Sequence, residues 1–216
     1  MAEAFLEQGY TVVRFDSTNT FGESAGNYEQ ATTTNYYEDL EDVITWAQGL
    51  SLGASQSWYQ EPFVLAGHSL GGLCTALYAE RHPEKVKALA PIATVVSGAL
   101  SMEGHKKHEE LRKWKETGWQ EEISRSKPGV IKRLPWSHME DRLKYDLLPE
   151  AHKFIMPVLL VVGECDESCP PAHQKILHAA LPGPKEFHII PGAPHTFRET
   201  AHLEELKKIL KAWLKI

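Results

Sequence analysis

Short apolar runs recur along most of this chain, and polar or glycine-rich residues bound each of them. Runs of four to eight β-branched, aromatic and aliphatic residues between turn-forming residues are typical of buried strands. We predict strands over Tyr10–Phe15, Phe63–Ala66, Val86–Ala93, Pro157–Gly163 and Glu186–Ile190.

Segments between these runs have a helical pattern instead, with apolar residues three and four positions apart. Leu40, Val43, Ile44 and Ala47 are one example, and Leu73, Ala76, Leu77 and Ala79 are another. The predicted helices cover Ala2–Gln8, a segment from Asn35, the residues after Ser69, Pro171–Leu181 and about Glu199–Leu214. Alternating strands and helices predict an α/β fold, with a mostly parallel sheet and helices on both of its faces.

The alternation stops between residues 97 and 148, where we find amphipathic helix signals and no strand run. A connection of this length needs structure of its own. We therefore expect a helical cap over 97–148, inserted into a core made of residues 1–96 and 149–216. Trp114, Trp119 and Trp136 lie in this segment and would either line an apolar pocket or pack the cap onto the sheet.

Composition narrows the class of protein. The 216 residues are 42% hydrophobic, which suits one domain with a substantial core. A net charge of −6 without a cluster of basic residues argues against nucleic acid as a partner. No apolar run is long enough to span a bilayer, and the first residues lack a signal-peptide pattern. We expect a cytoplasmic protein.

Three cysteines are too few and too irregular for a disulfide framework. Cys165, Cys169 and His173 are candidate metal ligands by residue type, but their spacing matches no common zinc pattern and two prolines interrupt it. We expect neither a metal nor another cofactor.

The segment Gly67-His68-Ser69-Leu70-Gly71-Gly72 connects a predicted strand to a predicted helix. A serine in this position, flanked by glycines, is typical of a sharp turn that exposes a nucleophilic hydroxyl. We expect Ser69 to have a strained backbone, and both Gly67 and Gly71 to be required by close approach of strand and helix. The alternative is a turn of small residues without chemistry.

A serine hydroxyl needs a base within hydrogen-bond reach, and the base needs a group that fixes its tautomer. Asp166 and His195 each follow a predicted strand, and the carboxyl ends of parallel strands meet at one edge of the sheet. We therefore expect Ser69, His195 and Asp166 to meet there. Glu164 and Glu167 are the alternative acids.

The Gly-x-Ser-x-Gly turn and the order Ser69, Asp166, His195 closely resemble the α/β-hydrolase superfamily. The resemblance implies catalytic roles for these three residues and an oxyanion contact from the Leu70 N–H. It also implies a pocket near His68, Trp114, Trp119 and Trp136. The implied activity is hydrolysis of a small-molecule substrate, a carboxylic ester or related acyl compound, through an acyl-enzyme. A serine peptidase acting on small peptides, or a protein without activity, are the alternatives.

The same resemblance implies that the family's first three strands are missing here, together with the loop that supplies the second oxyanion donor. The third of these strands would lie between those matching Tyr10–Phe15 and Phe63–Ala66. Three explanations are an N-terminal truncation, direct pairing of the two flanking strands, or a strand from another chain. We favour truncation, because Met1–Phe5 has the character of a helix interior.

Overall fold

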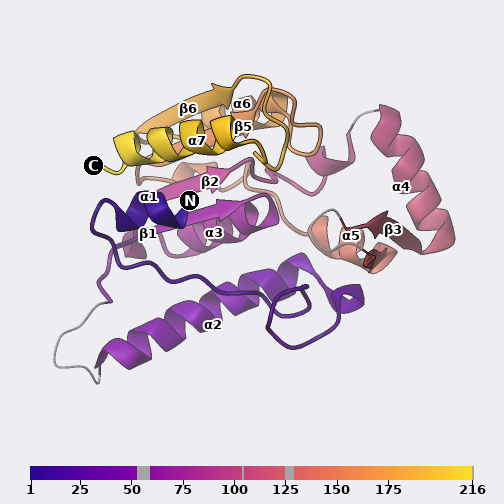
Figure 1. The fold of residues 1–216 in the computed structure, drawn as a ribbon, viewed down its shortest axis with the longest axis horizontal. Coiled ribbons are helices and arrows are strands. Elements are labelled where there is room, and N and C mark those ends of the chain that lie inside the picture. The colour runs from indigo at the N-terminus through magenta and orange to yellow at the C-terminus, as the bar shows by residue number, and fades with distance from the viewer. Residues whose placement is uncertain (53–58, 104, 125–128, 216) are drawn as a thin grey trace.

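The computed structural model describes residues 1–52, 59–103, 105–124 and 129–215. Its centre is a parallel four-stranded sheet in the order β1-β2-β5-β6 (Figure 1). The strands are β1 (Phe63–His68), β2 (Val86–Ile92), β5 (Val158–Gly163) and β6 (Lys185–Ile190). Short 3-10 helices are η1 (Tyr28–Gln30), η2 (Pro83–Lys85), η3 (Leu100–Met102) and η4 (Ala151–Lys153).

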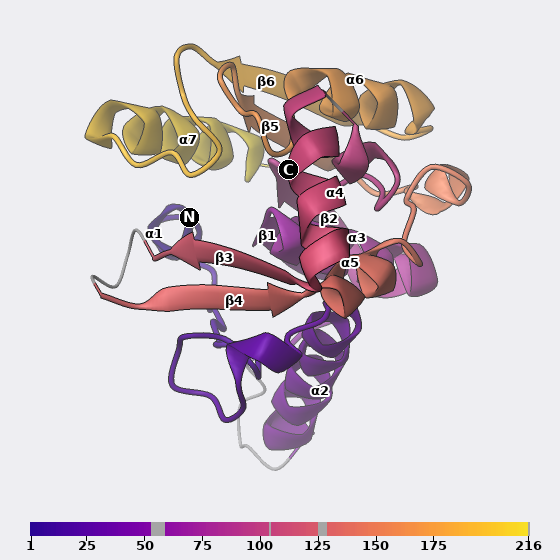
Figure 2. The same cartoon turned by 90° about the vertical axis from the view of Figure 1, so that its right-hand side faces the viewer.

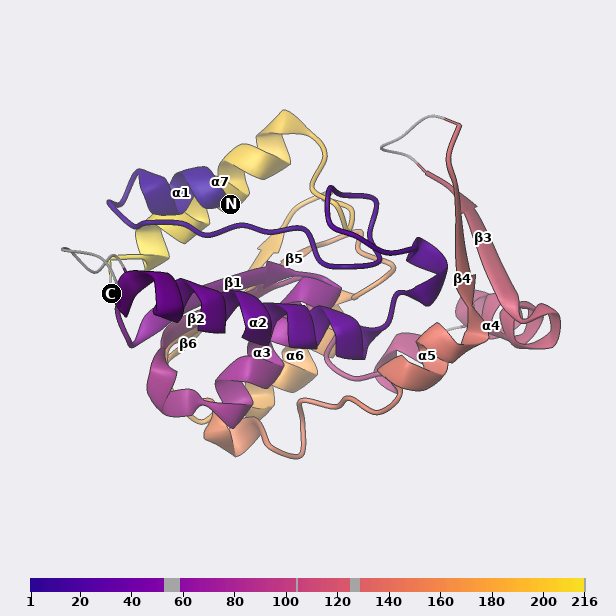
Figure 3. The same cartoon turned by 90° about the horizontal axis from the view of Figure 1, so that it is seen from below.

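Helices cover both faces of the sheet (Figure 3). One face packs against α2 (Thr33–Leu52), α3 (Leu70–Arg81) and α6 (Pro171–Ala180). The other face packs against α1 (Ala2–Leu6) and α7 (Thr200–Trp213). The expected mostly parallel sheet with two helical layers is therefore confirmed.

The strands contribute side chains to the hydrophobic cores on both faces of the sheet, because successive side chains of a strand point to opposite faces. In β2, Leu89 lies in the core under α2, α3 and α6, whereas Ala88 and Ala90 lie in the core under α1 and α7. All six residues of β5 are buried, as expected for an inner strand covered on both faces. This double burial explains why the strands are continuous apolar runs in the sequence.

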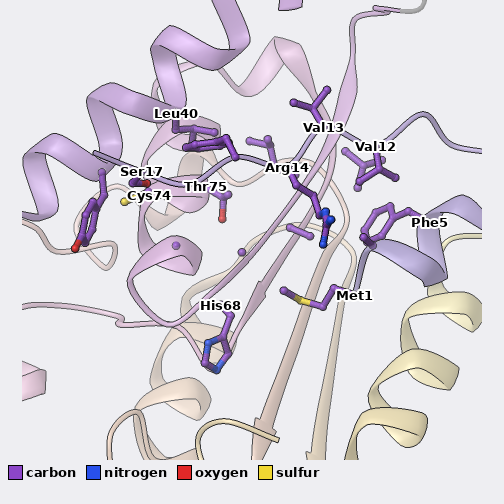
Figure 4. Close-up of a pocket in the computed structure, with 18 of the residues that line it drawn as sticks. Met1, Phe5, Val12, Val13, Arg14, Ser17, Leu40, His68, Cys74 and Thr75 are labelled. Atoms are coloured by element: carbon purple, nitrogen blue, oxygen red, sulfur yellow. The ribbon is translucent and has the colours of Figure 1, made fainter. Parts of the chain in front are cut away.

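The predicted strand at Tyr10–Phe15 is wrong, because this segment is irregular and joins no sheet. A cavity of about 570 Å³ lies between it and β1, with Val12, Leu40, Val64 and Cys74 among its lining residues (Figure 4). In the described chain, Tyr10–Phe15 therefore does not pair directly with β1, and β2 is the only strand that pairs with β1. A β-branched sequence adopts strand structure only where another strand offers hydrogen bonds and packing.

The segment 97–148 contains the expected helices but also strands that we did not expect. It includes α4 (His105–Thr117), β3 (Trp119–Ile123), β4 (Ile131–Pro135) and α5 (Trp136–Arg142). The strands β3 and β4 pair antiparallel and project beside α4 (Figure 2). The expectation of no strands here was wrong because every residue of β3 is exposed, so no apolar alternation marks it.

Contacts between side chains hold this segment together. Leu111, Trp114 and Met139 form a small buried cluster of their own, separate from the two clusters on the main sheet. The guanidinium of Arg133 on β4 lies 2.9 Å from the carboxylate of Glu121 on β3. These are contacts between residues distant in sequence, which a local pattern does not reveal.

Candidate active site

Ser69 stands at the turn between β1 and α3 with φ 59° and ψ −121°. A positive φ at a residue other than glycine costs free energy, and such strain occurs mainly at functional sites. A Cβ on Gly67 would lie 2.2 Å from the carbonyl oxygen of Gly71, so only glycine fits at position 67. The expectation for Gly71 itself was wrong, because a Cβ there would meet open space. Gly72 is the crowded neighbour, where a Cβ would lie 2.8 Å from the Thr94 hydroxyl oxygen.

The structure brings Ser69, His195 and Asp166 together from three separate loops. Nε2 of His195 lies 2.9 Å from Oγ of Ser69, and Nδ1 lies 2.8 Å from Oδ2 of Asp166. With a proton on Nδ1, the imidazole donates to Asp166 and accepts the hydroxyl hydrogen of Ser69 through Nε2. This is the arrangement in which a neutral imidazole can remove a proton from serine.

The carboxylate of Asp166 is completely shielded from solvent. Its Oδ1 accepts hydrogen bonds from the backbone N–H groups of Ser168 and Cys169, each at 2.8 Å. Burial opposes ionisation, but the hydrogen bonds from His195 and these two N–H groups outweigh it and hold the pKa of Asp166 below its usual value. Asp166 is therefore negatively charged at neutral pH.

The two alternative acids lie elsewhere. Glu164 accepts a hydrogen bond from the N–H of Gly192 at 2.9 Å, and Glu167 is exposed.

The loops that carry Asp166 and His195 pack closely, since a Cβ on Gly163 would lie 2.2 Å from the carbonyl oxygen of Ala193. This contact fixes the spacing between the acid and the imidazole.

His68 lies beside His195, with ring centroids 4.7 Å apart. Burial and the neighbouring His195 lower the pKa of His68, so its ring is neutral at neutral pH. Nε2 of His68 donates to the carbonyl oxygen of His195 at 2.7 Å. His68 thus supports the backbone of His195 and lines the cavity beside β1 (Figure 4).

Leu70 is the first residue of α3. The first N–H groups of a helix have no carbonyl partner within the helix, so this N–H is available beside Ser69. Leu70 also lines a cavity of about 320 Å³ in front of Ser69 and His195.

Side chains of residues 97–148 form much of the wall of that cavity. Trp114, Met139 and Arg142 line it, and a larger cavity of about 1120 Å³ beside it is lined by Trp114 and Trp119. Trp136 lines neither cavity and packs edge-on against Trp114, with ring centroids 5.6 Å apart. We did not anticipate Arg142, because it lies among charged residues that resemble an ordinary helix surface.

In the described part of the chain, no three His, Cys, Asp or Glu side chains converge as metal ligands would. No described helix combines the length and the apolar character needed to cross a bilayer.

A parallel sheet with helices on both faces, a strained serine after its first strand, and an acid and a histidine on later loops define an α/β-hydrolase. The chain belongs to the prolyl oligopeptidase family, Peptidase_S9, whose model matches residues 2–216. The resemblance to the α/β-hydrolase superfamily is thus confirmed, and the chain is a hydrolase of this class.

Two curated relatives illustrate the range of similar proteins. The chain is 25% identical over 245 residues to the "Uncharacterized 31.7 kDa protein in traX-finO intergenic region" of Escherichia coli, covering 99% of this chain and 83% of that protein. It is 31% identical over 169 residues to the mitochondrial palmitoyl-protein thioesterase ABHD10 of Mus musculus. That match covers 75% of this chain but only 50% of the thioesterase.

Solved structures share the fold. The alpha/beta hydrolase domain-containing protein 10 from mouse superposes with a TM-score of 0.73 at 24% identity, over 99% of this chain and 81% of that one. A monoacylglycerol lipase from Paleococcus ferrophilus superposes with a TM-score of 0.64 at 23% identity, over 89% of this chain and 79% of that one.

Proposed function

We propose that this chain is a serine hydrolase that cleaves carboxylic esters or related acyl compounds through an acyl-enzyme. The main support is the hydrogen-bonded series from Ser69 through His195 to Asp166, which opens into a cavity at the serine. The lipase and the thioesterase among the similar proteins agree with an acyl substrate. Residues 97–148 would act as a cap over this site.

In the first step, Oγ of Ser69 attacks the substrate carbonyl while Nε2 of His195 takes the hydroxyl proton. The negative charge of Asp166 stabilises the resulting imidazolium. The carbonyl oxygen becomes an oxyanion, to which the Leu70 N–H donates. His195 then returns the proton to the leaving alcohol, and the C–O bond to the alcohol breaks. Water, activated by His195, releases the acid in the second step.

Only one backbone donor for the oxyanion, Leu70, is identified among the described residues. One such donor typically contributes about 10²–10³ in kcat. We therefore expect turnover from this chain to be lower by about that factor than from an enzyme with two donors. Having one such donor favours the other alternative, a protein without activity.

A serine peptidase acting on small peptides is the second candidate, and the family match favours it. The same three residues would carry out amide cleavage, with His195 protonating the amine. The two candidates differ in which leaving group the site accepts.

The test combines fluorophosphonate labelling with hydrolysis of p-nitrophenyl butyrate and of a dipeptide p-nitroanilide. We expect Ser69→Ala to abolish labelling and ester turnover, and Ser137→Ala, which changes an exposed serine, to behave as wild type. Undiminished labelling of Ser69→Ala would overturn the assignment. Faster anilide than ester turnover would replace the esterase proposal with the peptidase.

A further inference from the structure

Arg142 ends α5 and lines the same 320 Å³ cavity as Ser69 and His195. Its Nε is shielded from solvent and has no hydrogen-bond partner among the described residues. Its Nη2 contacts Nε2 of His138 at 2.8 Å, and no hydrogen bond joins Nη1 to another described residue. Within the described part of the chain, the guanidinium is thus held at one nitrogen only.

His138 does not neutralise this cation. Nδ1 of His138 donates to the carbonyl oxygen of Ala31 at 2.7 Å, so Nε2 is the acceptor for Arg142. Burial and the adjacent Arg142 lower the pKa of His138 to about 4. The neutral ring therefore orients the guanidinium and leaves its positive charge uncompensated.

The neighbouring carboxylates are either committed elsewhere or not paired with Arg142. Asp141 accepts hydrogen bonds from Thr34 and forms an ion pair of 2.8 Å with Lys144. Glu110 and Glu122 also line the cavity, but neither forms an ion pair with Arg142 in the described structure.

Tyr28 and Tyr36 also act on Arg142, and burial raises the pKa of each phenol, so both are uncharged at neutral pH. Burial without a counter-charge lowers the pKa of the Arg142 guanidinium. A cation that is shielded from solvent at Nε and has no paired anion among the described residues is costly, because such groups are usually paired.

We propose that Arg142 binds a carboxylate carried by the substrate that Ser69 attacks, a proposal that rests on the hydrolase function above. The substrate class is an ester or related acyl compound with a second, anionic carboxylate group. Nη1 supplies a charge-assisted hydrogen bond, while Trp114, Leu111 and Met139 contact the apolar spacer between the two groups.

The first experiment compares matched esters. One pair is p-nitrophenyl hexanoate and the mono-p-nitrophenyl ester of adipic acid, which carries the carboxylate on the acyl side. The other is phenyl butyrate and 4-butyryloxybenzoate, which carries it on the leaving group. Wild type should prefer the carboxylate-bearing member of at least one pair.

Arg142→Gln should lower kcat/KM for the preferred ester about 10- to 100-fold, the usual effect of losing a hydrogen bond to a charged group. The neutral ester should change less than about twofold, and Arg142→Lys should retain part of the preference. Arg112→Gln, at an exposed position of α4, is the matched control. Absence of any preference in wild type, or equal slowing of both members of a pair, would overturn the proposal.

The second experiment needs no turnover. Adipate should raise the melting temperature of Ser69→Ala more than hexanoate does, and adding Arg142→Gln should remove the difference. If adipate binds in this way but no ester is cleaved, the hydrolase proposal fails and the Arg142 site stands. If Ser69-dependent cleavage occurs without any effect of a carboxylate, the Arg142 site fails alone.

Discussion

Replacing Asp166 by asparagine changes one atom at the centre of the proposed mechanism. Oδ1 of Asp166 accepts two backbone N–H groups, from Ser168 and Cys169, so the carbonyl oxygen of an asparagine would take that place. Its amide nitrogen would then face Nδ1 of His195, which is 2.8 Å from Oδ2 in the native protein. Because an amide N–H donates, Nδ1 would have to accept, and the ring proton would move to Nε2.

With the proton on Nε2, His195 has no lone pair to accept the proton of Ser69. The loss of the carboxylate also removes the charge that stabilises the imidazolium. The same exchange in a Ser-His-Asp triad costs about 10⁴ in kcat, which corresponds to about 5.4 kcal/mol in activation free energy. We expect a loss of this size in Asp166→Asn.

The assay is the initial rate of p-nitrophenyl butyrate hydrolysis, with the melting temperature as a check on folding. Glu167→Gln is the matched control, because it makes the same chemical change at an exposed position of the same loop. We expect its rate to stay within about threefold of wild type. A folded Asp166→Asn that retains more than a tenth of the wild-type rate would refute the reasoning.

Two further predictions concern stability. Gly67→Ala should lower the free energy of unfolding by about 1–3 kcal/mol in denaturant titrations, because its Cβ would lie 2.2 Å from the Gly71 carbonyl oxygen. Gly71→Ala, where space is open, should be neutral or stabilising, and equal losses in both would contradict this. The depressed pKa of His138, about 4 against an ordinary 6.5, means that the folded state resists protonation. Stability from His138 should be present above pH 6.5 and should fall by roughly 3 kcal/mol as the pH drops to 4, and His138→Gln should flatten this slope; an unchanged slope would exclude His138 as its source.

Much of the core could be predicted from sequence. The strands β1, β2, β5 and β6 are apolar runs, because an inner parallel strand is buried on both faces whatever its exact neighbours are. Their parallel direction follows from the helices between them. The placement of Ser69, Asp166 and His195 at one edge follows from that direction, and the structure has them within hydrogen-bond distance. Their catalytic roles stay predictions.

Other features depended on partners distant in the chain. Tyr10–Phe15 has the composition of a strand but no neighbouring strand with which to pair, so its backbone is irregular. The hairpin of β3 and β4 has no apolar alternation, and pairing across its two strands defines it. Local propensity acts over a few residues, whereas pairing is decided by whichever segment the fold brings alongside.

The position of Arg142 likewise depends on tertiary structure and not on local sequence. By sequence it is one charge among several on a short helix, with nothing to distinguish it from a solvated residue. Only the tertiary structure places it in the cavity of Ser69, held by His138 and without a paired carboxylate among the residues that the structure describes. The sequence by itself determined the α/β architecture and the three residues at the edge of the sheet, because strand direction and loop position are local properties. The shape and charge of the cavity were decided by the packing of residues 97–148 against that edge, since cavity walls come from segments far apart in the chain.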